Sequence, residues 1–148
     1  MTAMKPLLLC LMLAAVPAFA DITGLWDAED KKSQVEIFKL DDLWHGKIAT
    51  LKKPLTPEGE PNAGKPKIDH KNPDTAKRDD PIIGLQIIKN FSQASETEWT
   101  GGTIYDPKNG ETYKCKITKQ KDGGLKVRGF IGVSLIGRTT IWTRAADK

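Results

Sequence analysis

The sequence from Trp99 to Arg144 reads WTGGTIYDPKNGETYKCKITKQKDGGLKVRGFIGVSLIGRTTIWTR, and it decides the fold. Polar and apolar residues alternate in short runs, which are separated by the turn sequences DPKNG and KDGG. A period of two is typical of strands that bury one face, and glycine and proline favour tight turns. The stretch therefore predicts four antiparallel strands, at Glu98–Tyr105, Glu111–Thr118, Leu125–Ile131 and about Arg138–Arg144.

The preceding part of the chain continues this pattern toward the N-terminus. It predicts strands at Thr23–Ala28, Gln34–Leu40, Leu43–Leu51 and Ile82–Ile88. About eight strands, most of them linked to their sequence neighbour and with almost no helical pattern, predict an all-β fold. We expect a single up-and-down antiparallel β-barrel, whose interior can hold a ligand.

One connection, residues 52–80, is long and proline-rich and cannot be a central strand. Asn72 followed by Pro73 resembles a helix start, with Asn72 as the cap, and predicts one or two helical turns. Long connections in compact domains are often functional. This one is either a passive strap across the surface or a lid over one end of the barrel.

Residues 1–20 have the features of a signal peptide. Lys5 provides a positive start, Leu7–Val16 an apolar run too short to span a bilayer, and Ala18-Phe19-Ala20 a cleavage site. We therefore expect residues 21–148 to form one exported barrel domain, periplasmic or extracellular, without an integral membrane anchor.

Charge and cysteine content exclude several classes of function. The net charge is +4, with both signs dispersed, and no basic stripe with interleaved aromatic residues predicts nucleic-acid binding. Cys115 is the only cysteine after residue 20, so no intrachain disulfide is expected. It alternates with lysines on the apolar side of its strand, which predicts a small buried hydrophobe rather than a reactive thiol. The sequence does not indicate an oligomeric state.

No set of residues predicts catalysis. His45 and His70 are isolated from other ligand-type residues, which argues against a metal site, and the serines lack a nucleophile motif. No glycine-rich phosphate cradle or other cofactor motif is present. We therefore expect no enzymatic activity, no cofactor and no metal.

Arginine and aromatic residues are the strongest candidates for a defined role. Trp142 and Arg144 share one face of the last strand, where a guanidinium can cover an indole ring and plug the end of a barrel. Arg128 shares a face with Phe130. If that face is interior, Arg128 could bind a ligand carboxylate; if it is exterior, Arg128 is a surface charge.

Several motifs together resemble the secreted bacterial domain-of-unknown-function 2147 family. They are Gly24-x-Trp26, Gly46-x-Ile48, Asn72-Pro73, Pro81–Leu85, Trp99-x-Gly101-Gly102, Asp106–Tyr113, Arg128–Gly132, Gly137-Arg138 and Trp142-Thr143-Arg144. The resemblance implies a lipocalin-like barrel in which Arg144 packs on Trp26, and it supplies no active site. Many members have a cysteine pair where this chain has Asp69–Pro73, so a role for that pair does not carry over.

These observations predict a secreted or periplasmic small-molecule-binding protein, for an apolar or amphipathic ligand such as a fatty acid. The expected ligand contacts are Arg128, Phe130, Tyr113 and Trp99, and the expected barrel closure is Gly24, Trp26, Trp142 and Arg144. The alternative is a non-catalytic envelope interaction or stress-related module whose barrel is filled by its own side chains.

Overall fold

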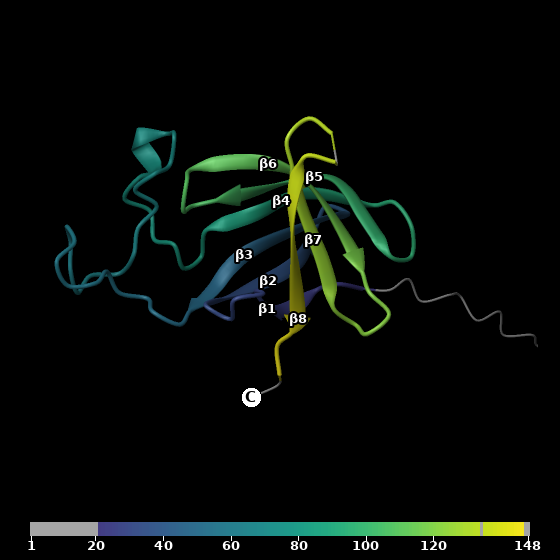
Figure 1. Cartoon of the computed structure of the whole chain (residues 1–148), viewed down its shortest axis with the longest axis horizontal. Helices are drawn as coiled ribbons and strands as arrows, with labels where there is room; N and C mark the ends of the chain where they lie inside the picture. The colour runs from purple at the N-terminus through teal and green to yellow at the C-terminus, as the bar shows by residue number, and fades with distance from the viewer. Residues whose placement is uncertain (1–20, 134, 147–148) are drawn as a thin grey trace, which may run out of the picture.

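The computed structural model describes residues 21–133 and 135–146, so the predicted signal peptide lies outside the described residues. Eight strands form one closed antiparallel barrel in which each strand pairs with its sequence neighbours (Figure 1). This confirms the predicted up-and-down barrel. The strands are β1 Gly24–Asp27, β2 Ser33–Leu40, β3 Leu43–Leu51, β4 Gln86–Gln93, β5 Glu98–Asp106, β6 Glu111–Lys119, β7 Leu125–Phe130 and β8 Gly137–Arg144.

The first and last strands close the barrel. Trp26 and Asp27 of β1 pair with Arg144 and Thr143 of β8. Strand β1 is only four residues long, so the closing ladder is the shortest in the sheet. Closure removes the exposed strand edges that an open sheet of this size would present to other chains.

The inner face of the barrel carries the hydrophobic core, because alternate residues along a strand point to the same side. The bulkiest of the fully buried side chains are Trp26, Trp99 and Phe91. Trp44 packs edge-on against Trp99, with ring centroids 6.1 Å apart. The rest of the buried core consists mainly of Ile22, Val35, Ile37, Ile48, Ile82, Ile87, Ile88, Cys115, Ile117, Leu125, Val127 and Trp142.

Two backbone irregularities change which residues face inward. Gly101 has φ +78° where the β5–β6 register shifts between Trp99 and Gly102, so both of those residues lie inside. On β4, Asn90 has φ +62°, and Ile88 and Phe91 are both fully buried although they are three residues apart. Gly102 has to be glycine, because a Cβ there would overlap the Phe91 ring.

The predicted strand at 82–88 was wrong in its position, since β4 begins at Gln86 and continues to Gln93. Gly84 has φ +92°, which interrupts extended backbone ahead of the strand. The amide of Ile82 donates to Lys67 O, and the amide of Gly84 donates to Ile48 O. The second half of β4 was not predicted, because the bulge at Asn90 interrupts the alternation of polar and apolar residues that indicates a strand.

The long connection between β3 and β4 extends away from the barrel beside the β5–β6 turn (Figure 1). It folds back on itself through the bridges Leu55–Pro66 and Ile68–Pro81. It contains one 3₁₀ turn, η1 Thr75–Lys77, which is capped by Asp74. Asn72 was therefore the wrong cap: its side-chain oxygen accepts from the Asp74 amide, which forms a turn before the helix instead.

Candidate ligand-binding site

One end of the barrel, which we call the closed end, contains the start of β1 and the end of β8. Arg144 lies over the indole of Trp26, with Cζ 4.0 Å from the ring centroid, and its guanidinium donates to Thr23 O at 2.6 Å. The Trp26 ring nitrogen donates to Ile22 O at 2.9 Å. Trp26 and Ile22 are fully buried, so this end is filled by side chains.

Gly24 fits the closed end for two independent reasons. Its φ of +117° is a conformation that residues with a side chain rarely adopt. A Cβ at this position would lie 2.6 Å from Nη1 of Arg144, in the space that the guanidinium occupies. The expected closure residues therefore meet at one end, and Trp142 is buried one step along β8 on the same face.

The opposite end, which we call the mouth, is less completely filled. It contains the β1–β2, β3–β4, β5–β6 and β7–β8 connections. Four inner-face residues there, on neighbouring strands, are only partly buried: Ile104, Tyr113, Gly129 and Thr140. A Cβ on Gly129 would meet Ile104 Cγ2 at 3.4 Å and Tyr113 Cβ at 3.5 Å, which places these three residues together. We refer to this partly exposed inner surface, which runs from β5 to β8, as the cup.

Arg138 belongs to the rim of this cup. The β7–β8 ladder pairs Leu125 with Trp142, Val127 with Thr140 and Gly129 with Arg138, without a register shift. Residues directly opposite each other project to the same face, and Leu125 and Val127 are core residues. Arg138 therefore leaves β8 on the inner face, at the mouth, and its side chain is exposed.

Arg128 is on the outer face, which corrects the interior alternative for this residue. It lies between the core residue Val127 and the inward-facing Gly129, and its Nη1 donates to Thr139 Oγ1 at 2.9 Å. Phe130 has the same parity and faces outward as well. The sequence could not distinguish the inner from the outer face of β7, because the outer face also carries a large apolar residue, Phe130.

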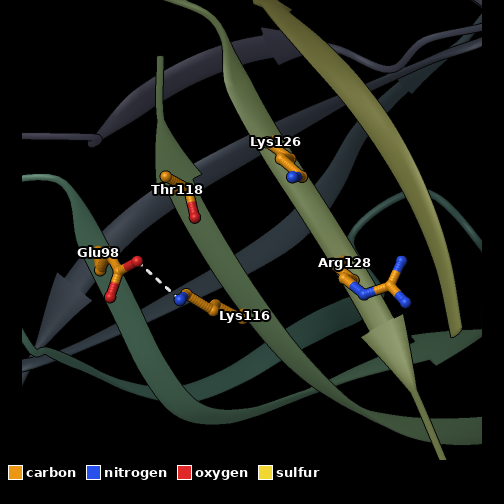
Figure 2. Close-up of a pocket in the computed structure, with 5 residues that line it drawn as sticks. All are labelled: Glu98, Lys116, Thr118, Lys126 and Arg128. Atoms are coloured by element: carbon orange, nitrogen blue, oxygen red, sulfur yellow. Dashed lines mark ion pairs between the residues drawn. The ribbon is translucent and has the colours of Figure 1, made fainter. Parts of the chain in front are cut away.

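Arg128 instead lines a shallow outer pocket of about 250 Å³ on β5, β6 and β7. Figure 2 shows its five lining residues, which are Glu98, Lys116, Thr118, Lys126 and Arg128. Lys116 Nζ lies 2.6 Å from the Glu98 carboxylate, so two of the charges in this pocket are paired with each other. The pocket offers little apolar surface, and we regard it as a solvated groove of the sheet.

The four expected ligand contacts do not converge on one point. Trp99 is fully buried in the core, while Tyr113 lies at the mouth with its hydroxyl bonded to Asn109 and Glu111. Within the described part of the chain, Trp99 Nε1 has no hydrogen-bond acceptor. A buried donor without an acceptor costs about 1–3 kcal/mol.

A buried carboxylate fixes the long connection to the barrel. Asp69 is fully buried and accepts from Tyr105 Oη and Asn72 Nδ2, both at 2.8 Å. Burial and this hydrogen bond raise the pKa of Tyr105 to about 12, so it remains a donor at neutral pH. The strap alternative predicted for this segment fits such an anchored contact.

Cys115 is a buried free thiol, as predicted. Burial raises its pKa to about 12, so the reactive thiolate is not populated at neutral pH. Among residues 21–133 and 135–146, no three His, Cys, Asp or Glu side chains are grouped so that they could hold a metal ion. In the same residues, no helix has the length and apolar character needed to cross a membrane.

Comparison with known proteins agrees with the architecture. The model of a family described as "Uncharacterized protein conserved in bacteria (DUF2147)" matches residues 24–144. The Helicobacter pylori protein HP1028, described as belonging to the lipocalin family, superposes with a TM-score of 0.72 at 20% identity. The match covers 86% of this chain and 84% of that one, so the barrel is lipocalin-like. No curated protein is detectably similar in sequence.

Proposed function

Since the chain belongs to the bacterial DUF2147 family and has a lipocalin-like barrel, we propose that it is an exported protein that binds a small amphipathic molecule, such as a fatty acid, at the mouth of that barrel. Barrels of eight strands are wide enough for one small ligand. Such folds typically bind small molecules rather than catalyse reactions.

The observation that carries the proposal is the difference in burial along the barrel axis. On β5 and β7, Trp99 and Leu125 toward the closed end are fully buried, whereas at the mouth of β5–β8 the side chains or backbone of Ile104, Tyr113, Gly129 and Thr140 are only partly covered. Solvent therefore reaches apolar surface inside the mouth. Covering that surface with the apolar part of a ligand is favourable, by roughly 25 cal/mol for each Å² removed from water.

Arg138 provides the polar half of the site. A guanidinium stays charged when it is partly desolvated, and its fork matches the two oxygens of a carboxylate. The side chain is exposed at the rim and starts from the inner face. A ligand with an apolar body would cover the inner surface of the cup, and its anionic group would bind the Arg138 guanidinium at the rim. Arg128 cannot take this role from the outer face of β7.

Export is part of the proposal and is supported by the sequence alone. Lys5, the apolar run Leu7–Val16 and Ala18-Phe19-Ala20 together favour cleavage before Asp21. Mass spectrometry of the folded protein recovered from its host tests this point. A product that begins at Asp21 is expected, and one that retains Met1 contradicts export by cleavage.

Two measurements test ligand binding. Native mass spectrometry of the purified protein should show bound lipid, and calorimetric titration with dodecanoate should give saturable binding. Arg138→Ala should weaken dodecanoate binding about tenfold, because a hydrogen bond to a charged group contributes about 1.5–3 kcal/mol. Arg128→Ala is the matched control, since it removes the same side chain from the facing strand on the outer side. It should change the affinity less than about twofold.

The outcomes separate the two candidate functions. If neither bound lipid nor saturable binding is found up to the solubility limit of dodecanoate, the proposal is wrong. The filled closed end would then favour the interaction module. Saturable binding that is lost in Arg128→Ala and kept in Arg138→Ala would move the site to the outer pocket.

A further inference from the structure

The β7–β8 connection, residues 131–136, presents apolar side chains directly to solvent. The exposed fractions of Ile131, Val133, Leu135 and Ile136 are 63, 57, 91 and 66%. Scattered exposed apolar residues are normal on soluble proteins, but four in one short connection are not. Exposed apolar clusters are typical of sites that bind a protein or a membrane.

Backbone hydrogen bonds join the two sides of this connection. The amide of Ile131 donates to Ile136 O at 3.0 Å, and the amide of Ile136 donates to Val133 O at 3.0 Å. Gly132 has φ +71°, which allows the tight turn. The connection projects beyond the ends of β7 and β8 at the top of Figure 1, well away from the long β3–β4 connection.

Three basic residues lie on the strands next to the apolar tip. Arg128 and Arg138 flank it along β7 and β8, and Lys114 on β6 is in register with Phe130 at its base. From Arg128 to Arg138 the sequence contains two cations and no aspartate or glutamate. The carboxylate of Glu29 accepts a hydrogen bond from the Ile141 amide, which is farther along β8 from the tip than Arg138.

We propose that four apolar side chains of this connection dock the protein onto an anionic phospholipid bilayer: Ile131, Val133, Leu135 and Ile136. The apolar side chains enter the boundary between headgroups and acyl chains, and the surrounding cations contact lipid phosphates. The cations near the tip, Lys114, Arg128 and Arg138, disfavour a second copy of this chain as the partner, because self-association would bring like charges together. This inference goes beyond the proposed ligand binding, since docking requires no occupied cup.

Docking in this way would bring the mouth of the barrel against the membrane. The β7–β8 connection lies at the mouth, next to Arg138 on the rim of the cup. A ligand could then pass between the bilayer and the barrel without crossing bulk water. The closed end, with Arg144 and Trp26, would point away from the bilayer.

Vesicle co-sedimentation of the purified folded protein tests the proposal. Vesicles of phosphatidylglycerol mixed with phosphatidylcholine should bind the wild type, and phosphatidylcholine alone should bind it at least about tenfold less. Leu135→Glu should weaken binding to the mixed vesicles at least about tenfold. The matched control is Leu55→Glu, which changes a half-exposed leucine in the long connection and should have less than about a twofold effect.

Arg138→Ser should weaken vesicle binding about fivefold, because a cation near an anionic surface is attracted electrostatically. Added salt should weaken wild-type binding for the same reason.

The proposal fails if the wild type does not sediment with the mixed vesicles at low salt. It also fails if Leu55→Glu is as damaging as Leu135→Glu. A concentration-dependent dimer that Leu135→Glu abolishes, without vesicle binding, would assign the surface to a second copy instead. None of these results depends on dodecanoate binding.

Discussion

Arg138 and Arg144 lie six residues apart on the same face of β8, yet they occupy opposite environments. Arg144 is held over the Trp26 ring and bonded to Thr23 O at the closed end. Arg138 leaves the strand at the mouth, beside inner-face residues that are only partly buried. One strand therefore carries a structural arginine at one end and a candidate ligand-binding arginine at the other.

The difference follows from what each end of the barrel has to cover. At the closed end, β1 is short and Ile22 and Trp26 fill the space between the first and last strands. At the mouth, glycine and threonine occupy the inner positions of β7 and β8, so less side-chain volume is available. We expect changes at the closed end to alter stability, and changes at the mouth to alter binding.

The largest expected effect is that of Trp26→Ala. Removing a fully buried aromatic side chain from the core should lower the free energy of unfolding by about 3–5 kcal/mol. Tyr113→Ala at the mouth, where the ring is partly exposed, should cost clearly less. Urea denaturation monitored by circular dichroism measures both. If Trp26→Ala and Arg144→Ala both leave the midpoint unchanged, the closure we describe does not contribute to stability.

Gly24→Ala and Gly132→Ala compare two positive-φ glycines, one at each end. At Gly24, backbone strain adds to a clash with the Arg144 guanidinium, and we expect a loss of about 2–3 kcal/mol. At Gly132 nothing lies within 4 Å of an added Cβ, so strain alone should cost about 1 kcal/mol. Thermal or urea unfolding measures both variants. Equal losses of stability would show that the Arg144 guanidinium moves aside from the added Cβ without an energetic penalty.

The two arginines on β8 give a direct test of the division. Arg144→Ala removes a cation–π contact and a hydrogen bond, which should cost about 1–2 kcal/mol of stability. Arg138→Ala removes an exposed side chain and should change stability by less than about 0.5 kcal/mol. Dodecanoate affinity should show the reverse order. Loss of binding in Arg144→Ala at unchanged stability would contradict the assignment.

The smallest expected effect concerns the ionisation of Cys115 and Tyr105. It changes the stability of the fold only at alkaline pH. Burial raises the pKa of Cys115 from 9.0 to about 12, and the pKa of Tyr105 rises from 10.0 to about 12. The folded state keeps protons that the unfolded chain releases, so stability is fully present below pH 9 and falls as the pH rises toward 12.

Single variants separate the two contributions to this alkaline loss. Cys115→Ala should make the decline of the urea midpoint shallower from about pH 9, and Tyr105→Phe from about pH 10. The first reports on the barrel interior, and the second on the contact that anchors the long connection through Asp69. Slopes identical to the wild type in both variants would show that neither proton is linked to folding.

Most of the strands could be predicted from alternation and turns, because their residues signal the structure locally. Strand β3 has the predicted bounds, and β2, β5, β6, β7 and β8 differ from the predictions by one residue at an end. The predicted position of β4 was wrong. The bulge at Asn90 and the turn at Gly84 are conformations that the neighbouring residues do not indicate. The contact of Arg144 with Trp26 was expected only from the family resemblance.

The sequence pointed to a different arginine from the one that we propose for the ligand. An arginine beside an apolar inner surface was expected, but the residue chosen was Arg128, which is outside. Arg138 was noticeable in the sequence only as an arginine near the start of the last strand. The exposed connection 131–136 was overlooked, because its apolar residues resemble the continuation of a buried strand.

The sequence by itself determined that the chain forms successive half-buried strands, where the turns between them fall, and which residues of each strand share a face. These properties depend on neighbours within a few positions, through the period of two and the backbone preferences of glycine and proline. The tertiary structure alone decided which face of β7 points inward, and therefore which arginine lies at the mouth. That choice depends on the register of each strand with its neighbours around a closed ring, and each bulge shifts that register for reasons far away in the sequence.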